Sequence, residues 1–152
     1  MDPWRFYIYH EGLARFASEP YSPSVPKSNR YAHLTNYSLN KKNEKYVPNL
    51  SAEQDDVGHK WSLTALCKNL EQIGVDMDLF WSKVYDVIIK SFLSVDSHVA
   101  AALKKIPNYK NNCFELLGFD ILIDADLKPW LLEVNLSPSL STDSPLDMRI
   151  KS

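Results

Sequence analysis

The chain has 152 residues, a length typical of one domain, and its 45% hydrophobic and 24% charged residues are typical of a folded protein rather than a disordered one. Its net charge of −2 gives no general basis for nucleic-acid binding, and no apolar run of about 20 residues could span a membrane. Two cysteines are too few for a disulfide framework, and four scattered glycines cannot build a glycine-rich phosphate loop. We therefore expect a reducing, intracellular setting.

The N-terminal part of the chain predicts two short strands followed by long loops. Gly12 lies between the two apolar segments and suits a turn that joins the strands. Three prolines and many polar residues punctuate the sequence that follows, and loops of this length are often functional. We expect strands at residues 4–9 and 13–17, loops at 18–28 and 40–59, and an extended or irregular segment at 31–39.

The middle of the chain predicts two amphipathic helices. Apolar residues recur at helical spacing over residues 61–73, which Gly74 ends, and over residues 78–106, which Pro107 ends. Asp76 or Asp78 suits the N-cap of the second helix. Such stripes are most often packing surfaces. In the second helix the stripe consists of Phe80, Val84, Val87, Ile88, Phe92, Val95, Val99, Leu103 and Ile106.

The C-terminal part predicts a β-hairpin and a short helix. Strands are expected at 113–124 and 130–136, with a turn at 124–129 and a helix at 146–151. The order of strands and helices indicates helices packed on an antiparallel sheet, in an α+β or α/β two-layer domain.

Each strand of this hairpin has one apolar face and one face that carries acids. Phe119, Ile121 and Ile123 alternate with Asp120, and Trp130, Leu132 and Val134 alternate with Leu131, Glu133 and Asn135. A turn centred between Asp126 and Leu127 places Asp120 opposite Glu133, with Asn135 further along the same face.

Two directly opposed carboxylates destabilise a sheet unless a cation lies between them. Oxygen ligands from Asp120, Glu133 and Asn135 suit Mg²⁺ or Ca²⁺ better than zinc, and magnesium leaves coordination positions for water and phosphate. The pattern thus permits a magnesium–nucleotide site. By itself the pattern more often indicates an ordinary solvent-facing side of a sheet, where acids cost little.

Four sequence blocks, in this order along the chain, resemble the tubulin tyrosine ligase-like enzymes, and above all their polyglutamylase group. The blocks are Met1–Arg5 with Gly12–Phe16, His33–Ser38, Phe114–Asp120 and Lys128–Leu140. The resemblance implies the C-terminal part of an ATP-grasp domain, an α+β fold that uses ATP and Mg²⁺. The chain begins inside the central region of the family, so the part with the nucleotide-binding lysines is expected to be missing and the isolated chain to be inactive, with apolar surface exposed.

The resemblance also implies roles for individual residues. Asp120, Glu133 and Asn135 match the metal ligands, the same three residues that the predicted register brings together, and Glu133 is expected to be catalytic. Arg15 matches a catalytic arginine that grips a carboxylate or phosphate. Thr35 and Asn36 match positions near the ATP phosphates. The residues that match positions around the incoming glutamate are Arg15, Tyr37, Ser38, Lys60 and Lys151. By themselves, Lys60 and Lys151 are more readily interpreted as solvated surface lysines, and His33 is expected to hold its loop rather than to transfer protons.

The activity implied is ligation of L-glutamate to glutamate side chains of tubulin tails through an acyl phosphate. We expect a monomer that acts on tubulin in the cytoplasm, on microtubules of the cytoskeleton or of a cilium or basal body, and that binds neither nucleic acid nor membranes. One alternative is a tubulin glycine or tyrosine ligase. Another, of a different class, is a catalytically inactive tubulin-binding fragment, for which the basic loop residues Lys41, Lys42 and Lys45 suit an acidic tail.

Overall fold

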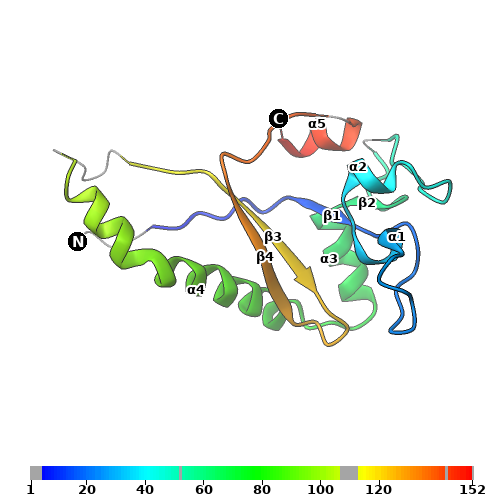
Figure 1. Cartoon of the computed structure of the whole chain (residues 1–152), viewed down its shortest axis with the longest axis horizontal. Coiled ribbons are helices and arrows are strands. Elements are labelled where there is room, and N and C mark those ends of the chain that lie inside the picture. The colour runs from blue at the N-terminus through cyan, green and yellow to red at the C-terminus, as the bar shows by residue number, and fades with distance from the viewer. Residues whose placement is uncertain (1–4, 52, 107–112, 143, 152) are drawn as a thin grey trace. The chain divides into compact units, whose positions relative to one another are not determined.

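The computed structural model describes residues 5–51, 53–106, 113–142 and 144–151. Within them the chain forms helices and two small antiparallel sheets, which confirms the α+β class, although the single sheet expected from the sequence is two separate two-stranded sheets (Figure 1). The elements are β1 (Leu13–Arg15), α1 (Arg30–His33), α2 (Tyr37–Asn40), β2 (Lys60–Ser62), α3 (Leu63–Gln72), α4 (Met77–Leu103), β3 (Leu117–Ile123), β4 (Pro129–Leu136) and α5 (Pro145–Lys151).

The elements divide between two compact units. The first, here called the hairpin unit, consists of Met1–Tyr7 and Val75–Ser139 and contains α4, β3 and β4. The second, here called the loop unit, consists of Ile8–Gly74 and Leu140–Ser152 and contains the other elements.

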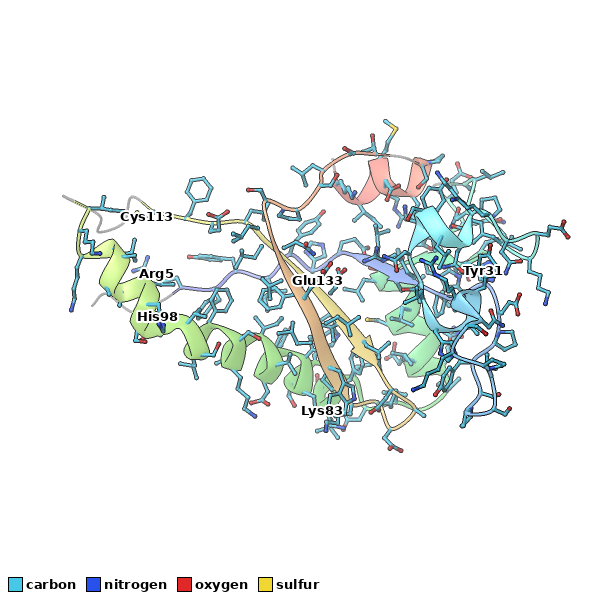
Figure 2. The ribbon with its side chains drawn as sticks, viewed as in Figure 1. Arg5, Tyr31, Lys83, His98, Cys113 and Glu133 are labelled. Atoms are coloured by element: carbon cyan, nitrogen blue, oxygen red, sulfur yellow. The ribbon has the colours of Figure 1, made fainter. Side chains whose placement is uncertain are left out.

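In the hairpin unit the long helix α4 supports the β3–β4 hairpin, which crosses it in Figure 1. The helix begins where predicted, because the side chain of Asp76 accepts a hydrogen bond from the backbone N–H of Leu79 at 3.0 Å and so caps its N-terminus. Figure 2 shows the side chains along this helix, with Lys83 near its start and His98 nearer its end.

Aromatic contacts join α4 to the apolar face of the hairpin. The ring of Phe119 lies 5.9 Å from that of Phe92, which in turn lies 4.5 Å from that of Phe6. The predicted stripe is buried at its start, at Phe80 and Val84, but exposed further along, at 44% for Val95. Burial therefore varies along the stripe, and Ala100 near the end of the helix is buried again. The helix ends at Leu103 rather than at residue 106, and Pro107 lies outside the described residues.

In the loop unit, β1 pairs with β2 rather than with the predicted strand at residues 4–9, and that prediction is wrong. Residues 5–9 form no regular structure. Residues 61 and 62, expected to begin a helix, belong with Lys60 to β2 instead. The helix α3 begins directly after it because the hydroxyl of Ser62 accepts a hydrogen bond from the backbone N–H of Ala65 at 2.9 Å.

Glu11 connects β1 to this helix. Its carboxylate accepts hydrogen bonds from the backbone N–H of Gly12 and from the N–H and hydroxyl of Thr64, in the first turn of α3. An anion at the start of a helix is favourable because the N-terminal N–H groups there lack partners within the helix. A strand pairing between distant parts of the chain is thus fixed by one acidic side chain.

Residues 31–39 were expected to be extended or irregular. They instead contain the end of α1 and the start of α2. The reason lies partly in Asn29, whose side chain accepts a hydrogen bond from the N–H of Tyr31 and caps α1. Partly it lies in Asn40, whose fully buried side chain donates to the carbonyls of Leu34 and Asn36. The two long loops on either side, at 18–28 and at the described residues of 41–59, form no helix or strand, as predicted.

The remaining predicted elements are found close to their expected positions. Strand β3 is shorter than predicted and begins at Leu117, β4 begins one residue early at Pro129, and α5 covers the expected C-terminal helix. None of the helices in the described residues is long and apolar enough to cross a membrane.

Candidate functional site

The predicted pairing of the two hairpin carboxylates is confirmed. Asp120 pairs directly with Glu133, and Gly118 pairs with Asn135, so the three polar side chains leave the same face of the hairpin. Glu133 lies about midway along β4 (Figure 2). The glycine is required at its position because a Cβ there would lie 2.9 Å from Cβ of Pro138.

A β-bulge separates this part of the hairpin from its turn. Between Asp120 and Ile121 the pairing shifts, so that Ile121 pairs with Leu131 and Leu122 pairs with Trp130. Leu132 is left as the extra residue of the bulge. The predicted faces of Trp130 and Leu131 are therefore wrong: Trp130 shares the face of Asp120, and Leu131 shares the apolar face.

The turn is organised by Asp124. One carboxylate oxygen accepts hydrogen bonds from the N–H groups of Asp126 and Lys128, and the other accepts one from the indole N–H of Trp130 at 2.7 Å. These bonds, foremost the one from Trp130, hold the pKa of Asp124 below its usual value. They also hold Leu127 in the left-handed region, at a φ of 56°, where a residue with a Cβ is disfavoured.

The metal-ligand candidates offer two carboxylates and one amide. The amide nitrogen of Asn135 donates a hydrogen bond to Oε1 of Glu133 at 3.1 Å, which leaves the amide oxygen of Asn135 to act as a ligand. No group of three or more His, Cys, Asp or Glu side chains suited to a metal occurs in the described part of the chain. Two carboxylates and one amide oxygen are a donor set that suits a cation with few protein ligands, as Mg²⁺ is.

The other predicted site residues all belong to the loop unit. Arg15 pairs directly with Lys60 across the β1–β2 ladder, so two cationic side chains leave the same face. Like charges opposed in this way destabilise a sheet unless anions neutralise them. One such anion is present: Nζ of Lys60 donates to both carboxylate oxygens of Asp147, at 2.6 Å each.

Tyr37 and Lys151 lie around the same ion pair. The ring centroid of Tyr37 is 5.8 Å from Nζ of Lys60 and 5.2 Å from Nζ of Lys41, distances at which a cation is attracted to an aromatic face. Nζ of Lys151 donates to the carbonyl of Ser141 at 2.7 Å, and its charge contributes to the lowered pKa of Asp147, the partner of Lys60. The structure thus brings together three of the residues that were matched to the incoming glutamate, and Ser38 follows Tyr37 in α2.

Thr35 and Asn36 lie immediately before α2, and Asn36 is its N-cap residue. Its side chain makes no capping hydrogen bond, which is unusual for asparagine at this position and leaves the amide for other partners. His33 has the structural role that was expected, because Nε2 contacts the carbonyl of Pro26 at 3.1 Å.

Asn40 is the residue that the sequence did not single out. Its side-chain oxygen accepts hydrogen bonds from the N–H and the hydroxyl of Ser18, and its nitrogen donates to the carbonyls of Leu34 and Asn36. It therefore fixes the two residues that flank Thr35. The only sequence signal was a polar residue at the end of a short apolar segment, which many loops share.

The acidic residues that anchor the loop unit predict a stability that falls in acid. Burial alone would raise the pKa of Glu11 and of Asp147. Hydrogen bonds from Gly12 and Thr64 outweigh burial at Glu11, so its pKa is lowered. Hydrogen bonds from Lys60 and Ser144 do the same at Asp147. A hydrogen bond from Ser62 lowers the pKa of Asp55. A carboxyl group whose folded pKa is depressed stabilises the fold above its unfolded pKa of about 4, and this stabilisation is lost as the pH falls through the folded value.

We therefore expect the melting temperature to stay constant from about pH 7 to pH 5 and to fall below that. Thermal unfolding across this range measures it. Glu11→Gln, which removes one of the titrating groups, should make the acid side of the profile shallower. A melting temperature that rises on acidification would contradict the prediction.

The two groups of side chains have complementary chemistry. The hairpin presents oxygen ligands suited to a divalent cation, and the loop unit presents cationic side chains suited to carboxylates or phosphates.

The sequence profile of the tubulin-tyrosine ligase family matches residues 1–152, so the chain belongs to this family. It is 50% identical over 151 residues to tubulin monoglutamylase TTLL4 of Homo sapiens and 49% identical over 151 residues to tubulin polyglutamylase TTLL5 of Homo sapiens, in both cases across 99% of this chain. It is 47% identical to a probable beta-tubulin polyglutamylase of Tetrahymena thermophila. The chain spans 12% or 13% of the length of these relatives.

Proposed function

We propose that this chain is part of an ATP- and Mg²⁺-dependent ligase that adds L-glutamate to glutamate side chains of tubulin tails. The names of its relatives, which are tubulin mono- and polyglutamylases at about 50% identity, support tubulin and glutamate as substrates. The proposal includes the C-terminal part of an ATP-grasp domain as the fold, with the remainder of the domain supplied by sequence outside these residues.

The observation that carries the proposal is the pairing of Asp120 with Glu133 in the hairpin, with Asn135 hydrogen-bonded to Glu133 on the same face. Opposed carboxylates would repel one another in an empty hairpin, and a divalent cation removes that repulsion. Magnesium bound by these three residues would neutralise charge on the phosphates of ATP and orient the transferred group.

The reaction consists of two transfers. An oxygen of the acceptor carboxylate attacks the γ-phosphorus of ATP, the bond to ADP breaks, and an acyl phosphate forms. The amine of the incoming glutamate then attacks the acyl carbon and loses a proton as phosphate leaves. Arg15, with its fixed guanidinium, suits the carboxylate or phosphate of these species.

The remaining loop-unit residues suit substrate binding. We assign Thr35 and Asn36 to the phosphates, and Tyr37, Ser38, Lys60 and Lys151 to the glutamate. Nζ of Lys60 lies 5.8 Å from the ring centroid of Tyr37, and the charges of Lys60 and Lys151 both act on Asp147. The protein is proposed to act as a monomer on tubulin in microtubules, including those of cilia or basal bodies.

The experiment uses the protein expressed from its complete coding sequence, incubated with tubulin, Mg-ATP and one labelled amino acid at a time. Incorporation of glutamate, but not of glycine or tyrosine, is expected. Incorporation of glycine or tyrosine instead would replace the proposal by a ligase of that amino acid. Binding to tubulin with no incorporation of any of them would indicate an inactive tubulin-binding protein.

A further inference from the structure

The loop unit contains a buried carboxylate, that of Asp147, to which the resemblance gives no role. Its side chain is 2% exposed, and it forms an ion pair with Lys60, whose side chain is 14% exposed. The two residues are 87 positions apart in the sequence and join α5 to β2.

We infer that Asp147 is a positioning residue, which holds the ammonium group of Lys60 where it binds a carboxylate of the incoming amino acid. This inference rests on the proposed function. It assigns the substrate-carboxylate site to Lys60 of β2 and Lys151 of α5, with Asp147, also in α5, as the fixed point.

The hydrogen-bond donors of Lys60 favour this role. A lysine ammonium has three N–H donors, and the two oxygens of Asp147 engage two of them. The third donor remains for another acceptor. Lysine has a flexible stem of four carbons, and the contact with both oxygens removes most of that freedom.

Asp147 is itself anchored by its neighbours. The hydroxyl of Ser144 donates to Oδ2 of Asp147 at 2.8 Å, and the N–H of Asp147 donates back to that hydroxyl at 3.2 Å. This reciprocal pair resembles a capping box and fixes the carboxylate at the first turn of α5. The carboxylate that orients Lys60 is therefore itself held in place at the first turn of α5.

The charges around Asp147 also favour an anionic ligand. A buried ion pair is a weak stability device, because apolar residues of similar volume commonly replace one without loss. Here one aspartate faces two lysines, Lys60 and Lys151, whose charge also contributes to lowering the pKa of Asp147. Arg15 leaves the same face of the ladder as Lys60. The group therefore keeps a positive charge, which suits an anionic amino acid.

The test is steady-state kinetics of the complete protein with Asp147→Asn, varying glutamate and ATP separately. We expect the KM for glutamate to rise about tenfold or more, with the KM for ATP within about twofold of wild type. Asp147→Glu keeps the charge and should bring the KM for glutamate part of the way back.

The matched control is Asp55→Asn. Asp55 lies 3.3 Å from Arg149, so this variant also removes an ion pair between α5 and the chain near β2, but it touches none of the residues assigned to the substrate. It should lower the melting temperature and leave the KM for glutamate within about twofold. If Asp147→Asn does not fold, Ser144→Ala loosens the same carboxylate and should raise the KM severalfold.

An unchanged KM for glutamate in folded Asp147→Asn, or in Ser144→Ala where the Asp147→Asn variant fails to fold, would overturn the inference. A lower KM would also overturn it, because Asp147 would then compete with the substrate for Lys60. Absence of glutamate transfer by the wild-type protein is a different result, which would contradict the proposed function and the inference together.

Discussion

Replacing Glu133 by glutamine is expected to lower glutamate transfer to tubulin at least about 100-fold, which corresponds to about 2.7 kcal/mol of transition-state stabilisation. Glutamine keeps the size of the side chain and its place in β4 but removes one of the two opposed carboxylates. The measurement is incorporation of labelled glutamate by the protein expressed from its complete coding sequence, at several Mg²⁺ concentrations. Higher Mg²⁺ should recover part of the activity.

The control is Asp126→Asn in the turn of the same hairpin. The backbone N–H of Asp126 bonds to Asp124, and its exposed side chain is assigned no role in the site. This variant should keep activity within about twofold of wild type. Full activity of Glu133→Gln, or equal losses in both variants, would remove Glu133 from the catalytic site.

Replacing Asn40 by leucine is expected to destabilise the loop unit by about 2–4 kcal/mol, because groups buried around it would lose their hydrogen-bond partners. The N–H of Ser18 and the carbonyls of Leu34 and Asn36 all bond to this side chain. Hydrogen–deuterium exchange should become faster in peptides that cover residues 18–43 and stay unchanged in peptides that cover α4.

Asn69→Leu on α3 is the matched control, since Asn69 is exposed and the same substitution there should change stability by less than about 0.5 kcal/mol. Unchanged exchange in residues 18–43 of Asn40→Leu would show that Ser18 and Asn36 keep their places without it. With Thr35 at the ATP phosphates, as proposed above, this variant should also weaken ATP binding, because the residues that Asn40 fixes flank Thr35.

The elements with strong periodic patterns were predictable. Helix α4 begins at its predicted aspartate cap, and the hairpin has its predicted strands, because both depend on residues that are close together in the sequence. The N-terminal strand pairing was not predictable. Strand β1 pairs with residues 60–62, and the interaction that fixes this pairing, between Glu11 and Thr64, spans 53 residues. No local pattern encodes such a contact.

The metal-ligand pairing was predicted correctly, yet the turn that the prediction assumed is not the one observed. Pairing near the turn is shifted by one residue, because Leu127 takes a left-handed conformation that its sequence does not favour and Asp124 holds it there. The bulge restores the predicted pairing at Asp120. The interaction of Lys60 with Asp147 could not be predicted from the sequence either. The sequence around Lys60 was compatible both with a solvated surface lysine and with a lysine of the binding site.

The bulge at Leu132 has a consequence for how this hairpin can vary during evolution. It divides the hairpin into two segments whose pairing frames are offset by one residue, and the acids belong to the segment away from the turn. A change of length in the turn can be absorbed at the bulge without moving Asp120 from Glu133. Loss of Leu132 itself would remove the bulge and leave the other pairs in place, because Leu132 is the residue without a partner. A change of length between Glu133 and Asn135 would instead turn one of these two side chains to the opposite face. Length variation in homologous hairpins should therefore be found in the turn and not between the bulge and Asn135.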